Sequence, residues 1–323
     1  MASGETLTLA PVGTFFNTPI CTDIDELSAD VAFIGIPYEF GKGLRNPSGQ
    51  KFAPKAIRDQ KRFYLYPGGE AYPTEDTDKH ACGRFNPNTG VEELKSVTMA
   101  DCGDLDILPS EGERNFERMT KVVRKILVSG AFPVVIGGDH SITFPVVRAF
   151  DRYDPLDIVY FDAHPDFTDE QDGVRIYGGS SFIRCSELPF IRNITNIGLE
   201  WCPKKEAYDA ALSYGCKIIT AERFREIGVA EVLKNIPQAD NIYISIDVDV
   251  LEPSVAPGTS VPTPGGLRYL ELRQLLRGLP KRGKIVGFDL VEVDPMCDCN
   301  NLTSRTAVEL ILDLLGAVFP AQE

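Results

Sequence analysis

Short hydrophobic runs recur along the chain and alternate with amphipathic stretches. The runs are rich in valine and isoleucine and mostly lack polar alternation, a pattern typical of strands buried on both faces of a parallel sheet. Eight segments fit this description: DVAFIGI, SVTMADC, FPVVIGG, LDIVYFDA, ITNIGLE, CKIIT, NIYISIDVDV and KIVGFDLVEV. Stretches with helical periodicity lie between them, such as GERNFERMTKVVRKILVSG and TSRTAVELILDLLGAV. This alternation predicts an α/β fold in which helices cover both sides of a mainly parallel sheet.

No internal repeat or low-complexity linker divides the chain, so we expect a single domain over residues 1–323. The stretch from Phe63 to Thr98 is rich in proline, glycine and charge and has no clear periodicity. It predicts a long surface excursion that serves as a lid or as an oligomer contact.

The net charge of −14 disfavours nucleic-acid binding, which needs basic surfaces, and mildly favours a cationic ligand. The N-terminus has neither a basic start nor a long apolar run, and no segment approaches 18 consecutive apolar residues. The eight cysteines are scattered and form no CxxC pair. We therefore expect a cytoplasmic protein with reduced thiols and no membrane partner.

Acidic residues and two of the three histidines gather where four of the predicted strands end. Open parallel sheets bind ligands beyond the carboxyl ends of their strands. The residues at these ends are Asp139, His140, Asp162, His164, Asp166, Asp247, Asp249, Asp289, Glu292 and Asp294. A single aspartate there is usually a helix cap, and a single histidine is often an ordinary buried side chain. Clustered buried carboxylates repel one another, however, and a pair of divalent cations removes that cost.

The chemistry of this set favours particular metals. Two imidazoles and about four carboxylates, with no thiolate, suit Mn²⁺ best and Ni²⁺, Co²⁺ or Fe²⁺ next. A structural zinc site would use cysteine.

Motifs that follow one another in order give the chain a family resemblance. They are ADVAFIGIPYEFGKGLRNPSGQKFAPKAIR, DCGD, GGDHS, DAHPD, SIDVDVLEPSVAPGTSVPTPGG and FDLVEVDP. In these motifs the chain resembles the ureohydrolases, the arginase–agmatinase family. The resemblance implies a three-layer α/β/α fold, assembly into trimers or hexamers, and two divalent metal ions per chain. The implied metal ligands are His140, Asp162, His164, Asp166, Asp247 and Asp249, with Asp162 and Asp247 touching both ions.

The resemblance also implies a reaction, the hydrolysis of a guanidino C–N bond to urea and an amine. Two metals that share a water yield hydroxide near neutral pH, and this hydroxide attacks the guanidinium carbon. Glu292 matches the family glutamate that pairs with the guanidinium, and Asp166 is the nearest proton donor for the leaving amine.

The chain departs from the family at Gly179. Most members carry a second histidine shortly after DAHxD, whereas this chain reads IYGGSSFIRC there. Three explanations are open: Gly179 makes room for a larger guanidine; Tyr177, Ser180, Asp169 or Glu170 carries protons instead; or the chain is a weakly active or silent subunit beside an active paralogous partner.

The loop after DAHPD bears on the substrate. Asp169, Glu170 and Asp172 would repel an α-carboxylate, while Arg175 would receive one unless it is paired within the loop. We expect Gly179, Tyr177 and Ser180 to line the substrate pocket with Glu292. The expected substrate is an agmatine-like compound, an alkylguanidine, guanidine or a biguanide rather than arginine. The alternative from another functional class is a protein that binds a guanidine without hydrolysing it.

Overall fold

The central feature of the computed structural model is a sheet of eight strands in the order β4-β1-β5-β10-β9-β6-β7-β8. The structure describes residues 13–39, 49–60 and 83–321. The strands are β1 (Val31–Ile36), β4 (Met99–Asp104), β5 (Phe132–Gly137), β6 (Leu156–Phe161), β7 (Ile191–Leu199), β8 (Lys217–Thr220), β9 (Asn241–Asp247) and β10 (Lys284–Val291). Each neighbouring pair is parallel. The predicted parallel sheet is therefore confirmed, with one strand from each of the eight segments.

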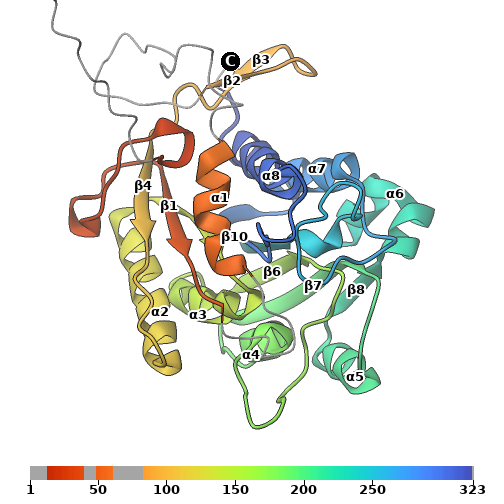
Figure 1. The fold of residues 1–323 in the computed structure, drawn as a ribbon. Coiled ribbons are helices and arrows are strands. Elements are labelled where there is room, and N and C mark those ends of the chain that lie inside the picture. Colours follow the sequence, from red (N-terminus) through yellow and green to blue (C-terminus); the bar gives the residue numbers. More distant parts are fainter. Residues whose placement is uncertain (1–12, 40–48, 61–82, 322–323) are drawn as a thin grey trace, which may run out of the picture.

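Helices cover both faces of this sheet, which gives three layers (Figure 1). One layer contains α1 (Ala53–Asp59), α6 (Ala221–Asn235), α7 (Tyr269–Gly278) and α8 (Leu302–Val318). The other contains α2 (Gly112–Ser129), α3 (Thr143–Val147), α4 (Ser181–Ser186) and α5 (Lys205–Tyr214). The predicted α/β/α architecture is confirmed.

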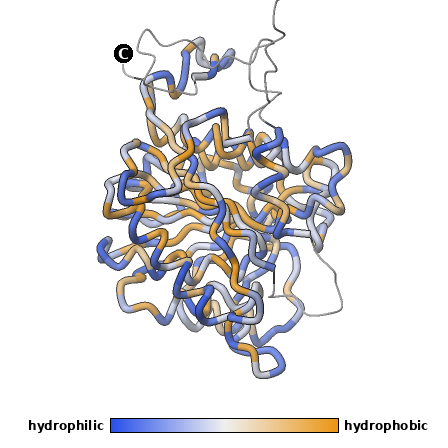
Figure 2. The backbone as a smooth tube through the Cα atoms, turned by 60° about the vertical axis from the view of Figure 1, so that its left-hand side comes forward, coloured by the Kyte–Doolittle hydropathy of each residue, from blue (hydrophilic) through white to orange (hydrophobic). Residues whose placement is uncertain are grey.

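Two apolar cores lie between the layers, one on each face of the sheet. In β5, Val134 and Ile136 belong to the core under α1 and α8, while Val135 between them belongs to the core under α2 and α3. Since successive side chains of a strand point to opposite faces, burial of both faces explains why the strands read as unbroken apolar runs. Figure 2 shows these apolar strands at the centre of the molecule.

The second part of the predicted surface excursion contains a hairpin, while residues 63–82 lie outside the described residues and the role as a lid or oligomer contact stays a prediction. Strands β2 (Arg84–Asn86) and β3 (Val91–Glu93) form an antiparallel hairpin. Ion pairs fasten this hairpin to α7 and α8, with Arg84 bound to Asp313 at 2.5 Å and Glu93 bound to Arg277 at 2.5 Å. Strands this short, fixed by charge, leave no apolar periodicity to read.

The DCGD motif has a structural role and lies away from the carboxyl ends of the central strands. The guanidinium of Arg58 on α1 makes two hydrogen bonds to the carboxylate of Asp101, at 2.9 and 3.0 Å. The same carboxylate accepts the backbone N–H of Phe15 at 2.9 Å. Asp101 thus ties the N-terminal segment and α1 to the edge of the sheet.

The seven cysteines among the described residues are free, while Cys82 lies outside them. Across the same residues, no helix combines the length and the apolar composition needed to cross a bilayer.

Candidate metal centre and active site

The candidate ligands come from strands that are neighbours in the sheet although they are far apart in the sequence. Strands β5, β10, β9 and β6 lie side by side at its centre. His140 follows β5, Glu292 follows β10, Asp249 follows Asp247 at the end of β9, and Asp162 follows β6. Because these strands are parallel, their carboxyl ends meet at one edge, and all six predicted ligands and Glu292 converge there.

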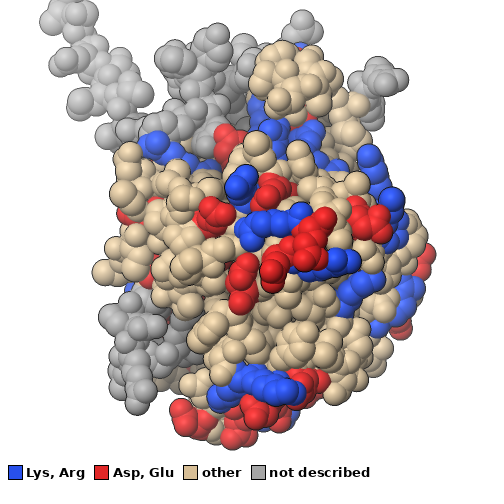
Figure 3. Space-filling model, turned by 90° about the vertical axis from the view of Figure 1, so that its right-hand side faces the viewer, with Lys and Arg blue, Asp and Glu red and all other residues tan. Residues whose placement is uncertain are grey.

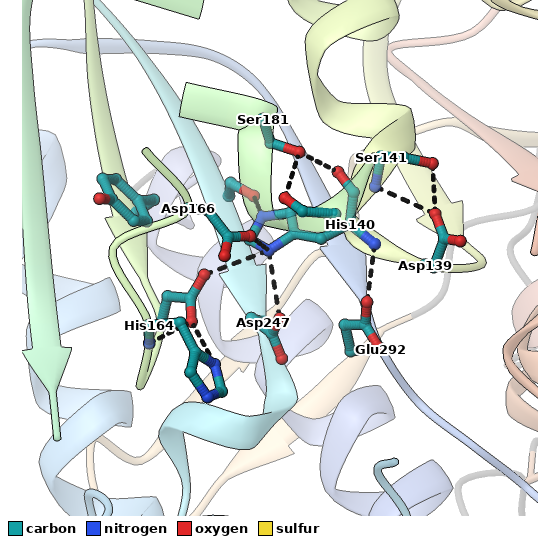
Figure 4. Close-up of polar contacts among 12 residues, drawn as sticks. Asp139, His140, Ser141, His164, Asp166, Ser181, Asp247 and Glu292 are labelled. Carbon is teal, nitrogen blue, oxygen red and sulfur yellow. Dashed lines mark hydrogen bonds and ion pairs between the residues drawn. The ribbon is translucent and has the colours of Figure 1, made fainter. Parts of the chain in front are cut away.

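The first ligand group surrounds the ring of His140. Its Nδ1 atom lies 3.1 Å from a carboxylate oxygen of each of three aspartates, Asp162, Asp166 and Asp247. Figure 4 shows the Asp166 and Asp247 carboxylates directed at this ring. Neighbouring ligands of an octahedral ion at about 2.1 Å are about 3 Å apart, so the spacing suits a divalent cation.

The second group surrounds His164. Its Nδ1 atom lies 3.0 Å from Oδ2 of Asp249 and 3.3 Å from Oδ1 of Asp162. The other oxygen of Asp162, Oδ2, faces His140. One carboxylate therefore contributes an oxygen to each group, as a carboxylate that bridges two ions would.

Two buried atoms of the first group indicate that this arrangement suits a cation. Nδ1 of His140 and Oδ2 of Asp162 are 3.1 Å apart, yet neither forms a hydrogen bond within the described structure. Buried polar atoms are rarely left without a partner. Atoms that face a common centre without aligning with one another have the geometry of metal ligands.

The electrostatics of the cluster point the same way. Burial and the negative charge of Asp162 raise the pKa of Asp166 to about 6. Burial and the charges of Asp249 and Asp162 raise the pKa of Asp247 well above its usual range. Burial opposes protonation of His164, but the charge of Asp249 and hydrogen bonds to Asp162 and Asp249 raise its pKa to about 12. Among the described residues, the carboxylates of the two ligand groups outnumber the imidazoles that face them, and divalent ions would provide the missing charge.

Supporting residues behind His140 fix its orientation, and sequence reasoning missed one of them. The hydroxyl of Ser245 lies 3.1 Å from Nε2 of His140 and donates to Oδ1 of Asp289 at 2.5 Å. The hydroxyl of Tyr243 donates to the other oxygen of Asp289 at 2.7 Å. Asp289 is thus a supporting residue rather than a member of either ligand group. The ISID motif placed Ser245 two residues before Asp247, but only the fold shows that it faces His140.

Two site residues, Asp166 and Glu292, have left-handed backbone conformations, with φ of 46° and 67°. Such values are costly for residues other than glycine and persist where the surroundings fix them. The carbonyl of Asp166 accepts the N–H of Phe182 at 3.0 Å, and the N–H of Glu292 donates to the carbonyl of Gly138 at 2.9 Å. The two turns carry both side chains back towards the metal centre.

Glu292 lies beside the first ligand group and is almost fully buried. Its Oε1 atom accepts the backbone N–H of His140 at 2.9 Å (Figure 4). Gly178 lies close by, since a Cβ atom added there would be 3.9 Å from this oxygen and 3.8 Å from Cβ of His140. A carboxylate in this place can bind a planar cation next to the metal centre.

The ring of Tyr177 lies against Gly179, and the explanation that this glycine makes room for a larger guanidine stays a prediction. A Cβ atom added at Gly179 would lie 2.8 Å from Cε2 of Tyr177. The hydroxyl of Ser180 hydrogen-bonds within the loop, at 2.9 Å to the carbonyls of both Arg175 and Tyr177. The described contacts give Ser180 a role in holding the loop, and its place in the substrate pocket stays a prediction.

The loop after DAHPD pairs its own charges. Arg175 lies 3.3 Å from Glu187 and 3.6 Å from Asp169. The buried guanidinium of Arg184 also binds Asp169. The interpretation of Arg175 as a paired residue is therefore confirmed.

Comparison with known proteins agrees with this geometry. The model of the arginase family matches residues 29–316. The chain belongs to the arginase family. Among similar relatives, guanidinopropionase of Pseudomonas aeruginosa is 31% identical over 95% of this chain and 91% of its own length. Mitochondrial guanidino acid hydrolase of Homo sapiens is 29% identical over 95% of this chain and 84% of its own.

Solved structures of the arginase family share the fold. Proclavaminate amidinohydrolase of Streptomyces clavuligerus superimposes with a TM-score of 0.83 at 30% identity, covering 97% of this chain and 99% of its own. The predicted family and the arginase-like fold are confirmed. The binuclear divalent-metal site of the arginase family fits the His/Asp cluster of this chain.

Proposed function

We propose that this arginase-family chain hydrolyses the C–N bond of a guanidino compound to urea and an amine, using two divalent ions. The observation that carries the proposal is the division of Asp162 between two ligand groups, with Glu292 beside them. The matched relatives, which include guanidinopropionase and agmatinase, bear names of the same reaction class.

Six residues would hold the ions. His140, Asp162, Asp166 and Asp247 would bind one of them, and Asp162, His164 and Asp249 the other, with Asp247 as a second bridge. When bound, such a pair supplies a nucleophile by lowering the pKa of a water to near neutrality. Two imidazoles with oxygen ligands favour Mn²⁺, and Ni²⁺ is the alternative.

The chain's own residues would position the substrate and move its protons. Glu292 binds the guanidinium by charge-assisted hydrogen bonds, and the N–H of His140 keeps that carboxylate in place. Holding the planar cation beside the metal centre puts its carbon within reach of the nucleophile. Asp166 would give a proton to the leaving amine.

The substrate class follows from the charges around the site. The one arginine of loop 169–175 is paired, so this loop offers no unpaired cation for an α-carboxylate. A guanidino compound without such a group fits better, which favours an agmatine-like compound, an alkylguanidine, guanidine or a biguanide over arginine. Tyr177, Gly179 and Ser180 stay the proposed pocket residues of this loop.

The remaining expectations concern the oligomeric state of the protein, its partners and its cellular location. We propose that the chain assembles into a trimer or hexamer. If the chain itself is catalytically silent, its partner would be an active paralogous subunit. Basic and acidic side chains interleave on the face shown in Figure 3, and the absence of a nucleic-acid partner stays a prediction. A cytoplasmic location and a single domain over residues 1–323 stay predictions, and three of the matched relatives are mitochondrial proteins by name.

A panel of guanidino compounds tests the proposed function. Purified chain loaded with Mn²⁺ or with Ni²⁺ should release urea from at least one guanidino compound that lacks an α-carboxylate, and arginine should be a poorer substrate. Glu292→Gln is the matched control, because it keeps the shape of the side chain and removes the charge that pairs with the guanidinium. Absence of urea from every compound, in a chain that holds two ions, would favour the silent-subunit alternative.

A further inference from the structure

Gln50 lies against the side of Glu292 that faces away from His140. It begins the short helix Gln50–Phe52, directly ahead of α1, and is fully buried. Its Nε2 atom donates to Oε2 of Glu292 at 2.8 Å and to the hydroxyl oxygen of Ser260 at 3.1 Å. The assignment of the amide follows from these contacts, because the reversed amide would set two oxygens against each other.

These contacts pin both oxygens of Glu292. Oε1 accepts the N–H of His140 at 2.9 Å, and Oε2 accepts the amide of Gln50 at 2.8 Å. A carboxylate held at both ends keeps its plane. Gln50 therefore orients the group that binds the planar cation.

The other end of the Gln50 amide has no partner. Both of its N–H groups are used, whereas Oε1 is buried and makes no hydrogen bond within the described structure. An unpaired buried carbonyl is costly, and where one occurs beside a binding site a ligand donor is the natural partner. A guanidinium offers only N–H donors on a planar frame, so it complements a carboxylate flanked by a carbonyl oxygen.

We propose that Gln50 is a substrate-binding and positioning residue: its N–H fixes Glu292, and its Oε1 accepts a hydrogen bond from an N–H of the bound guanidinium or amidinium. This inference rests on the proposed function. A neutral acceptor also makes chemical sense here, because it adds a hydrogen bond without adding another carboxylate. The site already holds five: Asp162, Asp166, Asp247, Asp249 and Glu292.

Binding of acetamidinium, a planar cation with N–H donors, tests the proposal without turnover. Calorimetry on the metal-loaded chain should give a Kd about tenfold or more weaker in Gln50→Met, which keeps the length of the side chain but removes both hydrogen bonds. Elemental analysis should still find two ions per chain. Gln60→Met is the matched control, since Gln60 is a buried glutamine at the other end of α1 whose Nε2 donates to Ala56 at 3.0 Å. It should bind acetamidinium as the unchanged chain does.

Gln50→Glu separates the two roles of the amide. It removes the donor to Glu292 and keeps an acceptor, so acetamidinium should bind it more tightly than it binds Gln50→Met. Tetramethylammonium, which has charge but no N–H, controls for the added charge and should not show the same recovery. A Kd for Gln50→Met within twofold of the unchanged chain would overturn the proposal, and so would a Gln50→Glu variant that binds no better than Gln50→Met. Urea release by the unchanged chain tests the proposed function separately.

Discussion

The molecule contains two buried acidic clusters, which differ in how their negative charge is compensated. In the first, Asp313 on α8 is fully buried and binds the guanidinium groups of Arg84, Arg273 and Arg277 at 2.5, 3.1 and 3.4 Å. Glu93 lies next to it and pairs with Arg84 and Arg277. We call this set the arginine cluster.

The metal centre has more carboxylates than the arginine cluster, and the ion pairs described for its four aspartates include no arginine or lysine. Its carboxylates face two imidazoles and one another. Where carboxylates hold the structure together, the chain provides guanidinium groups of its own. At the sheet edge, the described residues place no arginine or lysine against the four aspartates, which leaves their charge for two metal ions.

The largest effect is expected when Asp162, the ligand that the two groups share, is removed from the metal centre. Asp162→Ala should lose both ions and all urea release, because one oxygen of Asp162 belongs to each ligand group. The metal-free variant should also melt below the metal-free parent, because Asp162 pairs with both imidazoles and accepts the N–H of His164 at 2.6 Å. These contacts outweigh burial and lower the pKa of Asp162 to about 2, so its ionised form stabilises the fold.

Asp157→Ala is the control for Asp162→Ala. Asp157 lies at the other end of β6, is also buried, and pairs with Arg192 at 2.9 Å. It should keep two ions per chain by elemental analysis. An Asp162→Ala variant that retains one ion would show that Asp162 does not bridge.

Breaking the arginine cluster should cost stability instead of activity. Asp313→Ala leaves three guanidinium groups without their shared carboxylate, and we expect a loss of about 3 kcal/mol in the free energy of unfolding. This is the lower end of the usual range, because the arginines keep 20–25% of their side chains exposed. Denaturant titration measures the loss, and metal content should not change. A loss of metal in this variant would contradict the separation of the two clusters.

A smaller effect is expected when a support of the metal centre is removed. Ser245→Ala deletes the hydroxyl that lies 3.1 Å from Nε2 of His140. Removing such a partner behind a ligating histidine typically weakens metal affinity by about 10- to 100-fold. Competition with a chelator measures the affinity. Ser186→Ala is the matched control, because its hydroxyl binds the carbonyl of Ile183 within α4.

The smallest effect is expected in the loop after DAHPD, and it tests whether this loop binds the carboxylate of a substrate. Arg175→Ala removes ion pairs between side chains that are about half exposed, so stability should change by less than about 1 kcal/mol. The KM for a guanidino acid should stay within twofold of the parent value. A tenfold rise confined to carboxylate-bearing guanidines would show that Arg175 receives the carboxylate.

Much of this molecule could be predicted from the sequence because its signals are local. The apolar runs give the parallel sheet, and parallel strands bring their carboxyl ends to one edge. The six ligands and Glu292 could be named since each follows such a run directly. The division of Asp162 between two groups follows from side-chain geometry and needed the structure.

Other features depend on contacts between distant segments. Gln50 meets Glu292 across 242 positions, and Arg84 meets Asp313 across 229, so no pattern near either residue announces the pair. The hairpin at 84–93 escaped prediction for this reason. The filling of the space at Gly179 by Tyr177 is local in sequence, yet it depends on how the loop turns.

The ring of Tyr177 packs against Gly179, so the side chain that position 179 can hold depends on the residue at position 177. A histidine introduced at 179 meets this ring at its first side-chain atom, since Cβ would lie 2.8 Å from Cε2 of Tyr177. Such a substitution alone overpacks the loop, whereas shortening Tyr177 at the same time makes room for the new side chain. Gly179 and Tyr177 therefore act as one packing unit, and a histidine at 179 requires a change at both positions.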